Sequence, residues 1–447
     1  MSASNLVARL ANRDAKIGVI GLGYVGLPLS VEFAAAGFDV VGFDIDADRV
    51  ERLQQADSYV DDVSDADISD ALDAGFTPND DPSAVADCDA YVIAVPTGIA
   101  NGEPRLESIE AAARTIADQR DERETLVVVS STVYPGATQE VVAPIVIPDG
   151  TDKNNPADAP TRLAMVPERL NPGSDHEIAD IPLVIGADDE PARRAATELF
   201  DAIVEETVPV SNAETAELTK TLENTYRMVN IALVNQLVDL ADVLEADVWE
   251  AIDAAATKPF GFQPFRPGPG VGGHCIPVDP QFLTWRAREK GTEIPLIERS
   301  HEVNESMPEK VIEDVLTALR ARGVEPEEAR VLALGASYKP NVGDARNSPA
   351  IDVVTGLADH ASVTVVDPHV PAGDSPLPLE LDLDAIDLDA IDAVVLLVDH
   401  DAFDLDALGE RASFVYDSRN AMPEETNATV LTLGDRHRID EEPRIRR

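Results

Sequence analysis

Residues 16–44 read KIGVIGLGYVGLPLSVEFAAAGFDVVGFD, and this run predicts the fold of the N-terminal domain. The apolar residues 16–22 predict a buried strand, residues 28–36 predict a helix that ends at Gly37, and residues 39–43 predict a second strand. The run is therefore a strand, helix, strand unit with a glycine-rich turn after its first strand.

The turn follows the pattern G-x-G-x-x-G, with glycines at Gly21, Gly23 and Gly26 around Tyr24 and Val25. Glycines in this position permit a tight turn and let backbone N–H groups meet a pyrophosphate at the helix N-terminus. A glycine turn that serves packing alone is the alternative. Because the motif stands directly between a strand and a helix, we favour dinucleotide binding.

Asp44 ends the second strand, 18 residues after Gly26. A carboxylate at this place can accept hydrogen bonds from the ribose hydroxyls of a dinucleotide and would repel a 2′-phosphate. The sequence therefore predicts NAD rather than NADP as the cofactor.

Further strands are expected after this unit, separated by helical stretches. They lie at residues 90–95, 126–130, 163–166 and 183–186. Alternation of strands and helices is typical of an α/β fold with a doubly wound parallel sheet.

The opening pattern repeats from Arg330 onward. Residues 331–335, 363–367 and 392–398 echo the strands of the first domain, which predicts a second Rossmann-like domain. Its first turn, Gly335-Ala-Ser-Tyr338, has no G-x-G-x-x-G motif, so we expect it to bind something other than an NAD pyrophosphate.

The middle of the chain is expected to be helical. Ser211-Asn-Ala-Glu214 has the pattern of a capping box, and residues 213–257 contain neither Gly nor Pro. These residues predict one long helix, or a pair with a short break, that links the two domains and pairs with its copy in a homodimer. We expect three domains, at residues 1–210, 211–322 and 323–447.

The charge balance excludes some partners. Asp and Glu number 84 against 35 Lys and Arg, a formal net charge of −49, so nucleic acid and anionic membranes should be repelled. An acidic surface adapted to molar salt explains this charge better than a cationic ligand does. The chain has no apolar run near the ~20 residues that span a bilayer and no N-terminal apolar signal, so we expect a cytoplasmic enzyme. We expect no metal.

The two cysteines differ in setting. Cys275 stands in the loop Gly268-Pro-Gly-Val-Gly-Gly-His-Cys-Ile-Pro-Val-Asp279, where glycines let the backbone approach a ligand closely. A thiol in such a loop suits a nucleophile better than core filling. Cys88, directly before a strand, is expected to be a small buried residue.

Lys220 and Asn224 are four residues apart on the expected long helix, so they share one face. An ammonium and an amide there could stabilise an oxyanion. A solvated helix face is the alternative, which the scarcity of lysine, seven in the chain, weakens.

Taken together, these segments resemble the UDP-glucose/GDP-mannose dehydrogenase family over almost the whole chain. The matching segments are the glycine turn, Ser130-Ser-Thr-Val-Tyr-Pro-Gly136, Pro167-Glu-Arg-Leu-Asn-Pro-Gly173, the Lys220/Asn224 helix, the Cys275 loop and Tyr338-Lys-Pro-Asn-Val-Gly-Asp-Ala-Arg346. Residues 223–233 and 258–262 look like the branch that acts on UDP-N-acetylhexosamines. Val278 stands where UDP-glucose enzymes usually have Lys, which counts against UDP-glucose.

The resemblance implies a four-electron oxidation of a sugar CH2OH to a carboxylate. Cys275 would form a thioester, Lys220 and Asn224 would stabilise the oxyanions, Asp279 would help activate water, and Glu168 would assist proton transfer.

The resemblance also implies the binding residues. Thr97, Thr132, Arg49 and Arg346 would join the glycine turn and Asp44 around NAD. The UDP-sugar would contact Glu168, Arg169, Leu170, Asn171, Lys220, Asn224, Lys258, Phe265, Gly270, Gly272, Gly273 and Lys339.

Two other functions are compatible with parts of this pattern. A two-electron hydroxyacid-type dehydrogenase would have no use for the Cys275 thiol. A non-catalytic NAD or nucleotide-sugar sensor could have lost the nucleophile, which this chain keeps.

Overall fold

The computed structural model describes residues 3–60, 62–121, 123–147, 160–169, 177–371, 373 and 375–439. The chain divides into two compact units. The first comprises residues 1–223 with 281–293, and the second comprises residues 224–280 with 294–447.

An eight-stranded sheet forms the centre of the first unit, in the order β10-β9-β8-β7-β4-β1-β2-β3. The strands are β1 (Lys16–Ile20), β2 (Asp39–Phe43), β3 (Phe76–Asn79), β4 (Ala90–Ile93), β7 (Thr125–Val129), β8 (Thr161–Met165), β9 (Leu183–Gly186) and β10 (Thr207–Val210). All neighbours pair in parallel except β8 and β9. After β4 the chain forms a short antiparallel hairpin of β5 (Gly98–Ala100) and β6 (Glu103–Arg105).

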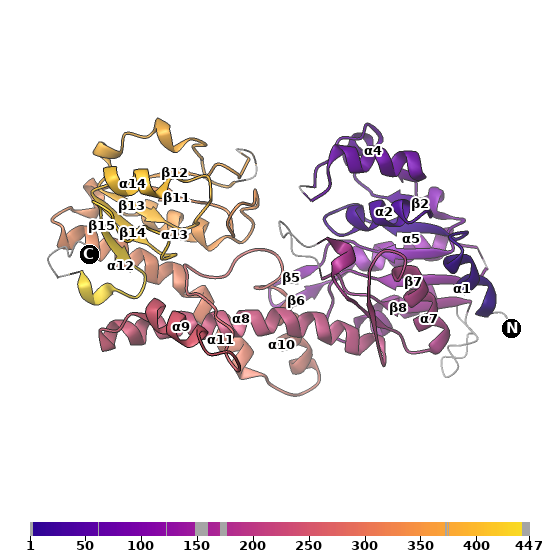
Figure 1. Cartoon of the computed structure of the whole chain (residues 1–447). Helices are drawn as coiled ribbons and strands as arrows, with labels where there is room; N and C mark the ends of the chain where they lie inside the picture. The colour runs from indigo at the N-terminus through magenta and orange to yellow at the C-terminus, as the bar shows by residue number, and fades with distance from the viewer. Residues whose placement is uncertain are drawn as a thin grey trace. The chain divides into compact units, whose positions relative to one another are not determined.

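Helices cover both faces of this sheet. They are α1 (Ala3–Ala11), α2 (Gly26–Ala35), α3 (Ala47–Gln54), α4 (Asp65–Ala74), α5 (Glu107–Gln119), α6 (Ala143–Val146) and α7 (Glu190–Phe200) (Figure 1). One core cluster joins α1, α2, α4 and α7 to alternate strand residues such as Ile17, Val19 and Val40. The buried side of α5 belongs to the other face, where α5 contacts β4 and α6.

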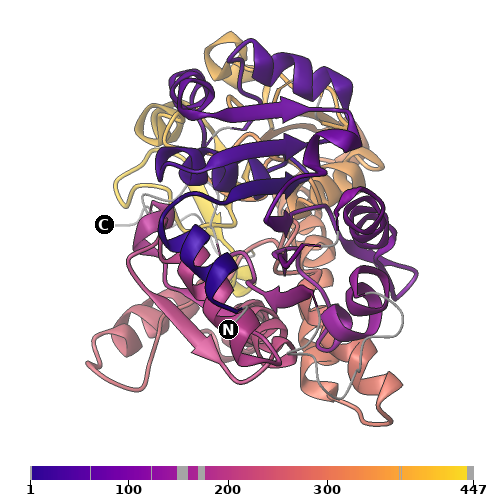
Figure 2. The ribbon, with the colours of Figure 1, turned by 90° about the vertical axis from the view of Figure 1, so that its right-hand side faces the viewer.

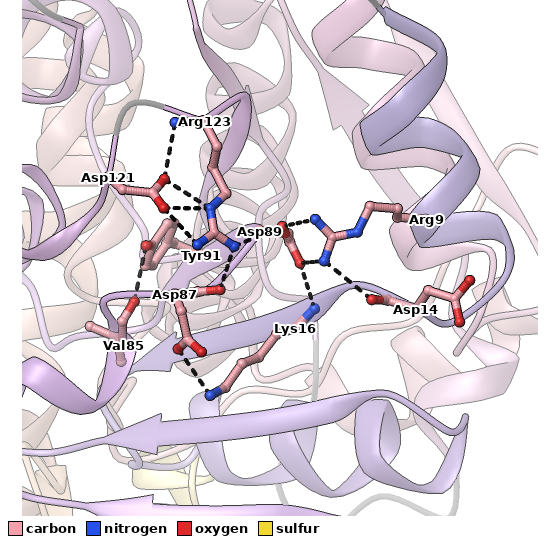
Figure 3. A network of polar contacts seen from close by, with 9 residues as sticks. All are labelled: Arg9, Asp14, Lys16, Val85, Asp87, Asp89, Tyr91, Asp121 and Arg123. Carbon is pink, nitrogen blue, oxygen red and sulfur yellow. Dashed lines mark hydrogen bonds and ion pairs between the residues drawn. The ribbon is translucent and has the colours of Figure 1, made fainter.

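Helix α1 is held to the sheet by a buried carboxylate. Asp89 is fully buried, and both of its oxygens accept hydrogen bonds from Arg9 of α1, while its Oδ2 accepts another from the N–H of Lys16 at 2.9 Å. Arg123 lies 3.6 Å from the same carboxylate (Figure 3). Because a buried charge needs partners, these contacts anchor α1, which also packs against α7 (Figure 2).

Helix α8 (Ala213–Leu244) begins at the predicted residue, but its N-terminal cap differs from the predicted capping box. The side chain of Asn212, rather than Ser211, accepts the N–H of Thr215, at 2.8 Å. The capping-box prediction is wrong because Asn212, a strong N-cap residue, directly precedes the helix.

The helical region has the second of the two predicted arrangements, a pair of helices with a short break. It breaks after α8 at Glu245, which has a φ of 52°, and resumes as α9 (Val248–Ala256) behind the cap of Asp247. A Glu at positive φ and a strong N-cap two residues later separate the helices without any Gly or Pro.

The second unit contains a five-stranded parallel sheet in the order β12-β11-β13-β14-β15. Its strands are β11 (Arg330–Leu334), β12 (Ser362–Val366), β13 (Ala393–Leu396), β14 (Phe414–Asp417) and β15 (Thr429–Thr432). Helix α10 (Asp279–Glu289) begins in this unit, but its residues from 281 onward belong to the first. The later helices of the second unit are α11 (Pro295–Glu305), α12 (Met307–Ala321), α13 (Pro349–Ala358) and α14 (Leu405–Arg411). A core cluster joins the second half of α8 with α9, α12 and α13 on one face.

The expected fold class is confirmed: two doubly wound sheets, parallel apart from the β8–β9 pair, and a long helix are present. The strands at 39–43 and 183–186 have the predicted bounds, and the bounds of the other predicted strands shift by at most two residues. In the described part of the chain, none of the helices has the length and apolar character needed to cross a membrane.

Candidate active site

The glycine turn lies at the point where the strand order of the first sheet reverses, between β1 and β4. Ligands of doubly wound sheets bind at this place, outside the carboxyl ends of the strands. Gly21 has a φ of +94°, and a Cβ there would lie 2.6 Å from the carbonyl oxygen of Ala94. A Cβ on Gly23 would meet open space, and α2 begins at Gly26. The turn therefore leaves room for a dinucleotide at the helix N-terminus.

Asp44 is buried directly after β2. Its Oδ2 accepts the N–H of Leu22 at 2.8 Å, and its Oδ1 accepts the N–H of Asp46 at 3.0 Å. Arg49 lies 3.9 Å from Oδ2 and also faces the ring of Tyr59. A carboxylate oxygen has two lone pairs, so Asp44 can still accept from a ribose while it holds the glycine turn.

The loops after β4 and β7 are tied to each other. Thr97 donates its hydroxyl hydrogen to the carbonyl of Thr132 at 2.6 Å, and Ser131 donates to the carbonyl of Val95 at 2.7 Å. Because β4 borders the switch point, both predicted cofactor threonines lie at the same edge of the sheet.

Glu168 and Lys220 form a buried ion pair. The Lys220 Nζ donates to Glu168 Oε2 at 3.2 Å. Burial raises the pKa of Glu168, and the nearby Lys220 ammonium opposes this rise. A carboxyl group with a raised pKa is suited to proton transfer near neutral pH. A small cavity beside it is lined by Val25 of the glycine turn, Ser130 and Glu168, among others.

One helical turn further along α8, Asn224 makes the second buried contact. Its Nδ2 donates to Asp279 Oδ2 at 2.6 Å. Asp279 is the first residue of α10, and its N–H donates to the carbonyl of Cys275 at 2.9 Å. Cys275 itself is exposed. The structure thus brings Asn224, Asp279 and the Cys275 turn together within the second unit.

The glycines before Cys275 are required by close packing. Gly273 has a φ of +83°, its N–H donates to the carbonyl of Arg346 at 3.3 Å, and its own carbonyl accepts from the Asn347 side chain at 3.2 Å. A Cβ on Gly272 would lie 2.7 Å from the carbonyl oxygen of Asn347, and one on Gly270 would lie 2.9 Å from Pro349. The Arg346 side chain pairs with Asp344 at 2.7 Å.

The first turn of the second sheet is closed around Asp367, which follows β12 as Asp44 follows β2. Its oxygens accept the N–H groups of Ala336, Ser337, His369 and Val370 and contact the fully buried His400 at 3.1 Å. Burial would raise the pKa of Asp367, but these hydrogen bonds lower it below its ordinary value.

Because Asp367 is saturated by its own loop, it cannot serve a ribose as Asp44 can. This agrees with the prediction that the second domain binds something other than an NAD pyrophosphate. Ser337 in turn donates to the carbonyl of Lys339 at 2.9 Å, which orders the segment that carries this lysine.

The remaining predicted binding residues lie in several places. Arg169 pairs with Glu223 of α8 at 2.7 Å. Lys258 is exposed and faces the ring of Phe260, while Phe265 lies 5.8 Å from the ring of Tyr226. Leu170 and Asn171 lie outside the described residues.

Cys88 is almost fully buried, as predicted, and burial raises its pKa to about 12. Such a thiol is inert near neutral pH. Of the two cysteines, Cys275 is therefore the candidate nucleophile.

Two sets of supporting residues were not predicted. Asn235 of α8 accepts the N–H of Gly268 and donates to Asn304, which holds the start of the glycine loop. Buried Glu217, one turn before Lys220, accepts the N–H groups of Gly136 and Thr138. Asn235 shares a face of α8 with Asn224, and Glu217 lies one turn before Lys220. This helical spacing is the sequence signal that could have indicated both residues.

These features define the class of protein, an NAD-dependent oxidoreductase. The first unit carries the glycine turn and the Lys220–Glu168 pair, and the second carries the exposed Cys275 beside Asp279. Three family models match the chain. They describe the NAD-binding, central and UDP-binding domains of the UDP-glucose/GDP-mannose dehydrogenase family, at residues 15–204, 214–306 and 332–424. The chain belongs to this family, which confirms the resemblance and the NAD cofactor.

Similar proteins span nearly the whole chain. UDP-N-acetyl-D-mannosamine dehydrogenase of Pyrococcus horikoshii is 32% identical over 92% of this chain and 96% of its own. UDP-N-acetyl-D-glucosamine 6-dehydrogenase of Pseudomonas aeruginosa is 34% identical over 92% of this chain and 98% of its own. The solved structure of UDP-D-ManNAc dehydrogenase from P. horikoshii has a TM-score of 0.85 at 30% identity, and covers 94% of this chain and 100% of that one.

The position of Asp44 predicts cofactor selectivity. Asp44→Ala should weaken NAD binding by about 1–3 kcal/mol, because it removes a charge-assisted acceptor, and should narrow the preference over NADP. Calorimetry with both cofactors measures this, with the exposed Asp48→Ala as a control for loss of charge. NAD affinity equal to that of the wild type would mean that Asp44 does not contact the ribose.

Glu217 predicts a pH dependence of stability. Burial raises its pKa from 4.5 to about 7, against the lowering effect of the Gly136 and Thr138 N–H groups. Since the folded state holds this proton more tightly, the stability that Glu217 contributes is present below pH 4.5 and is lost as pH rises through about 7.

Relative to the wild type, Glu217→Gln should therefore gain up to about 3 kcal/mol as pH rises from 4 to 8. Thermal denaturation across this range measures the difference, with exposed Glu214→Gln from the same helix as a control. A difference that does not vary with pH would contradict the prediction.

Proposed function

We propose that the chain oxidises the C6 alcohol of a UDP-N-acetylhexosamine, UDP-ManNAc or UDP-GlcNAc, to the uronate through a thioester on Cys275. The contact between Asn224, Asp279 and the Cys275 turn carries this proposal. The names of the relatives from P. horikoshii and P. aeruginosa support the substrate class, and Val278 disfavours UDP-glucose.

The cofactor supplies the oxidising power, since bound NAD accepts one hydride from the sugar carbon at each oxidation. The glycine turn and Asp44 would hold its pyrophosphate and ribose, with Arg49, Thr97, Thr132 and Arg346 around it. A turn whose Gly21 and Gly26 cannot carry a Cβ fits such a ligand.

The chain's own residues would act on the aldehyde that the first oxidation produces. The Cys275 sulfur forms a C–S bond to the aldehyde carbon, and its proton passes to the new oxygen. The hemithioacetal loses the second hydride and a proton to become a thioester. Water then attacks the thioester, the C–S bond breaks, and the thiol and a carboxylate remain. Over the cycle two NAD are reduced, one water is consumed and three protons are released.

The contacts of Lys220 with Glu168 and of Asn224 with Asp279 indicate the supporting roles of these residues. The Lys220 ammonium stabilises the oxyanion of each tetrahedral species, together with an amide hydrogen of Asn224. Asp279, which accepts from Asn224, helps to activate the hydrolytic water. Glu168, whose pKa is raised by burial, assists proton transfer at the sugar alcohol.

The product yield separates this proposal from its alternatives. A four-electron enzyme yields two NADH per sugar, a hydroxyacid-type dehydrogenase yields one, and a sensor yields none. UDP-ManNAc, UDP-GlcNAc and UDP-glucose are each supplied in limiting amount in molar KCl. The NADH absorbance at completion gives the yield per sugar, which distinguishes the three functions. Two NADH from UDP-glucose alone would favour the UDP-glucose 6-dehydrogenase alternative.

The thioester route makes a prediction about Cys275. Cys275→Ser should abolish uronate formation while NAD binding persists, because an alcohol is a poor nucleophile at neutral pH and its ester is stable. Chromatography of the products measures uronate, and Cys88→Ala serves as the cysteine control. Full turnover by the serine variant would refute the covalent route.

We also propose a homodimer through α8, as the sequence predicts. The sequence places the apolar residues Met228, Ile231, Val234, Leu237 and Val238 at mixed three- and four-residue spacings on this helix. Met228, Val234 and Val238 are buried within the subunit, whereas Leu237 is exposed. Seven exposed residues form an apolar stripe along α8: Leu218, Leu222, Tyr226, Leu233, Leu237, Leu240 and Leu244. Their spacings of three, four and seven residues place them on one side of the helix. We keep the three-domain division at residues 210 and 322 as part of the same proposal.

Salt should control this dimer. Each subunit carries a net charge of −49, and the Debye length falls from ~10 Å at 0.1 M salt to ~3 Å at 1 M, so screening relieves the repulsion. This fits a cytoplasmic enzyme adapted to high salt, as proposed from the composition.

We predict that Leu233→Arg combined with Leu240→Arg yields a monomer at salt concentrations where the wild type is a dimer. Light scattering across a KCl series, beside the NADH assay, measures both states. Leu381→Arg, an equally exposed leucine outside α8, is the matched control. A wild-type monomer that is fully active at low salt would refute the dimer.

A further inference from the structure

Arg286 of α10 lies at the centre of a cluster that the proposed chemistry does not use. We call Tyr134, Gly136, Glu140, Trp285 and Arg286 the Arg286 cluster. Its first three residues follow β7, and the other two belong to α10. All five lie in the first compact unit.

The contacts of Arg286 are close and directional. Its Nη1 and Nη2 donate to the two carboxylate oxygens of Glu140 at 3.0 and 2.6 Å. Its guanidinium carbon lies 5.1 Å from the centre of the Tyr134 ring, and that ring lies 4.6 Å from the ring of Trp285. The Arg286 side chain is 12% exposed and that of Glu140 is 44% exposed, so the guanidinium is largely buried while its carboxylate partner reaches solvent.

Gly136 is held from two sides. Its φ is +103°, and a Cβ there would collide with the Arg286 guanidinium. Its N–H donates to the buried carboxylate of Glu217 on α8. One loop is therefore bonded to the helix of Lys220 and also packed against α10.

Helix α10 continues directly from the segment that carries the candidate nucleophile. It begins at Asp279, four residues after Cys275, and the N–H of Asp279 donates to the carbonyl of Cys275. A helix transmits a constraint along its length because its backbone hydrogen bonds make it stiff. Whatever fixes α10 at Arg286 therefore limits the movement of the Cys275 turn at its N-terminal end.

We propose that Arg286 is a positioning residue, which anchors α10 through the Arg286 cluster and so places the Cys275 turn for capture of the aldehyde. This inference rests on the proposed function. Without the anchor, the thiol meets the aldehyde carbon less often, and the aldehyde leaves before the second oxidation.

A loss of stability alone would have a different effect. It would reduce the number of active molecules, but each remaining molecule would still yield two NADH per sugar. The yield of NADH per sugar therefore separates positioning from stability.

The experiment uses the full chain with limiting UDP-N-acetylhexosamine, excess NAD and semicarbazide as an aldehyde trap. Arg286→Met should lower kcat by about tenfold to a hundredfold, lower the NADH yield from two toward one, and release trapped aldehyde. Glu140→Gln should have the same effect to a smaller degree, and the double variant should be no worse than Arg286→Met. Arg114→Met, which removes an exposed arginine from α5, should keep a yield of two.

The outcomes distinguish the two proposals. If Arg286→Met turns over more slowly but still yields two NADH and no trapped aldehyde, the positioning role is overturned. If the double variant loses the product of the two single effects, Arg286 and Glu140 act independently and the cluster is overturned as a unit. If the wild type itself does not yield two NADH, the proposed function fails. Should Arg286→Met fail to fold, Glu140→Gln alone decides by the same yield.

Discussion

A single turn of α8 makes the two buried polar contacts on which the candidate site depends. Lys220 pairs with Glu168 at the edge of the first sheet, and Asn224 binds Asp279 at the start of α10. Both residues are 5% exposed, and a buried charge or amide is tolerated only where its partners are fixed. Their spacing of four residues is set by the pitch of the helix, so the relative position of the ammonium and the amide follows from secondary structure and needs no loop to maintain it.

The two sheets share a second structural feature, a carboxylate directly after the second strand of each. Asp44 and Asp367 both accept N–H groups from the turn that follows the first strand. Asp44 keeps acceptor capacity for a ribose, whereas four N–H groups and His400 saturate Asp367. One structural device, a carboxylate that closes a turn, is therefore compatible with cofactor binding in the first domain and excludes that mode of binding in the second.

Local patterns predicted much of this molecule. The glycine turn and most strands of the two sheets follow from residues that are neighbours in sequence, where periodicity and turn chemistry act, although β3, β10, β14 and β15 were not predicted. The contacts between Glu217 and Gly136, and between Arg286 and Glu140, join residues that are 81 and 146 positions apart, and no periodicity encodes them. The burial of individual apolar residues on α8 cannot be predicted for a similar reason. Met228 and Leu233 are equally apolar in the sequence, and packing alone decides that the first is buried and the second exposed.

The most direct test of the account is the mass of the Cys275 peptide after reaction. In Asp279→Asn, hydrolysis of the thioester should be slow because the carboxylate that helps to activate the water is lost, so the covalent species should accumulate. With UDP-N-acetylhexosamine and NAD present, acid quenching and mass spectrometry should find the Cys275 peptide heavier by the acyl form of the nucleotide sugar, and the Cys88 peptide unchanged. Uronate formation by this variant, sampled before completion, with an unmodified Cys275 at every time point would contradict the thioester.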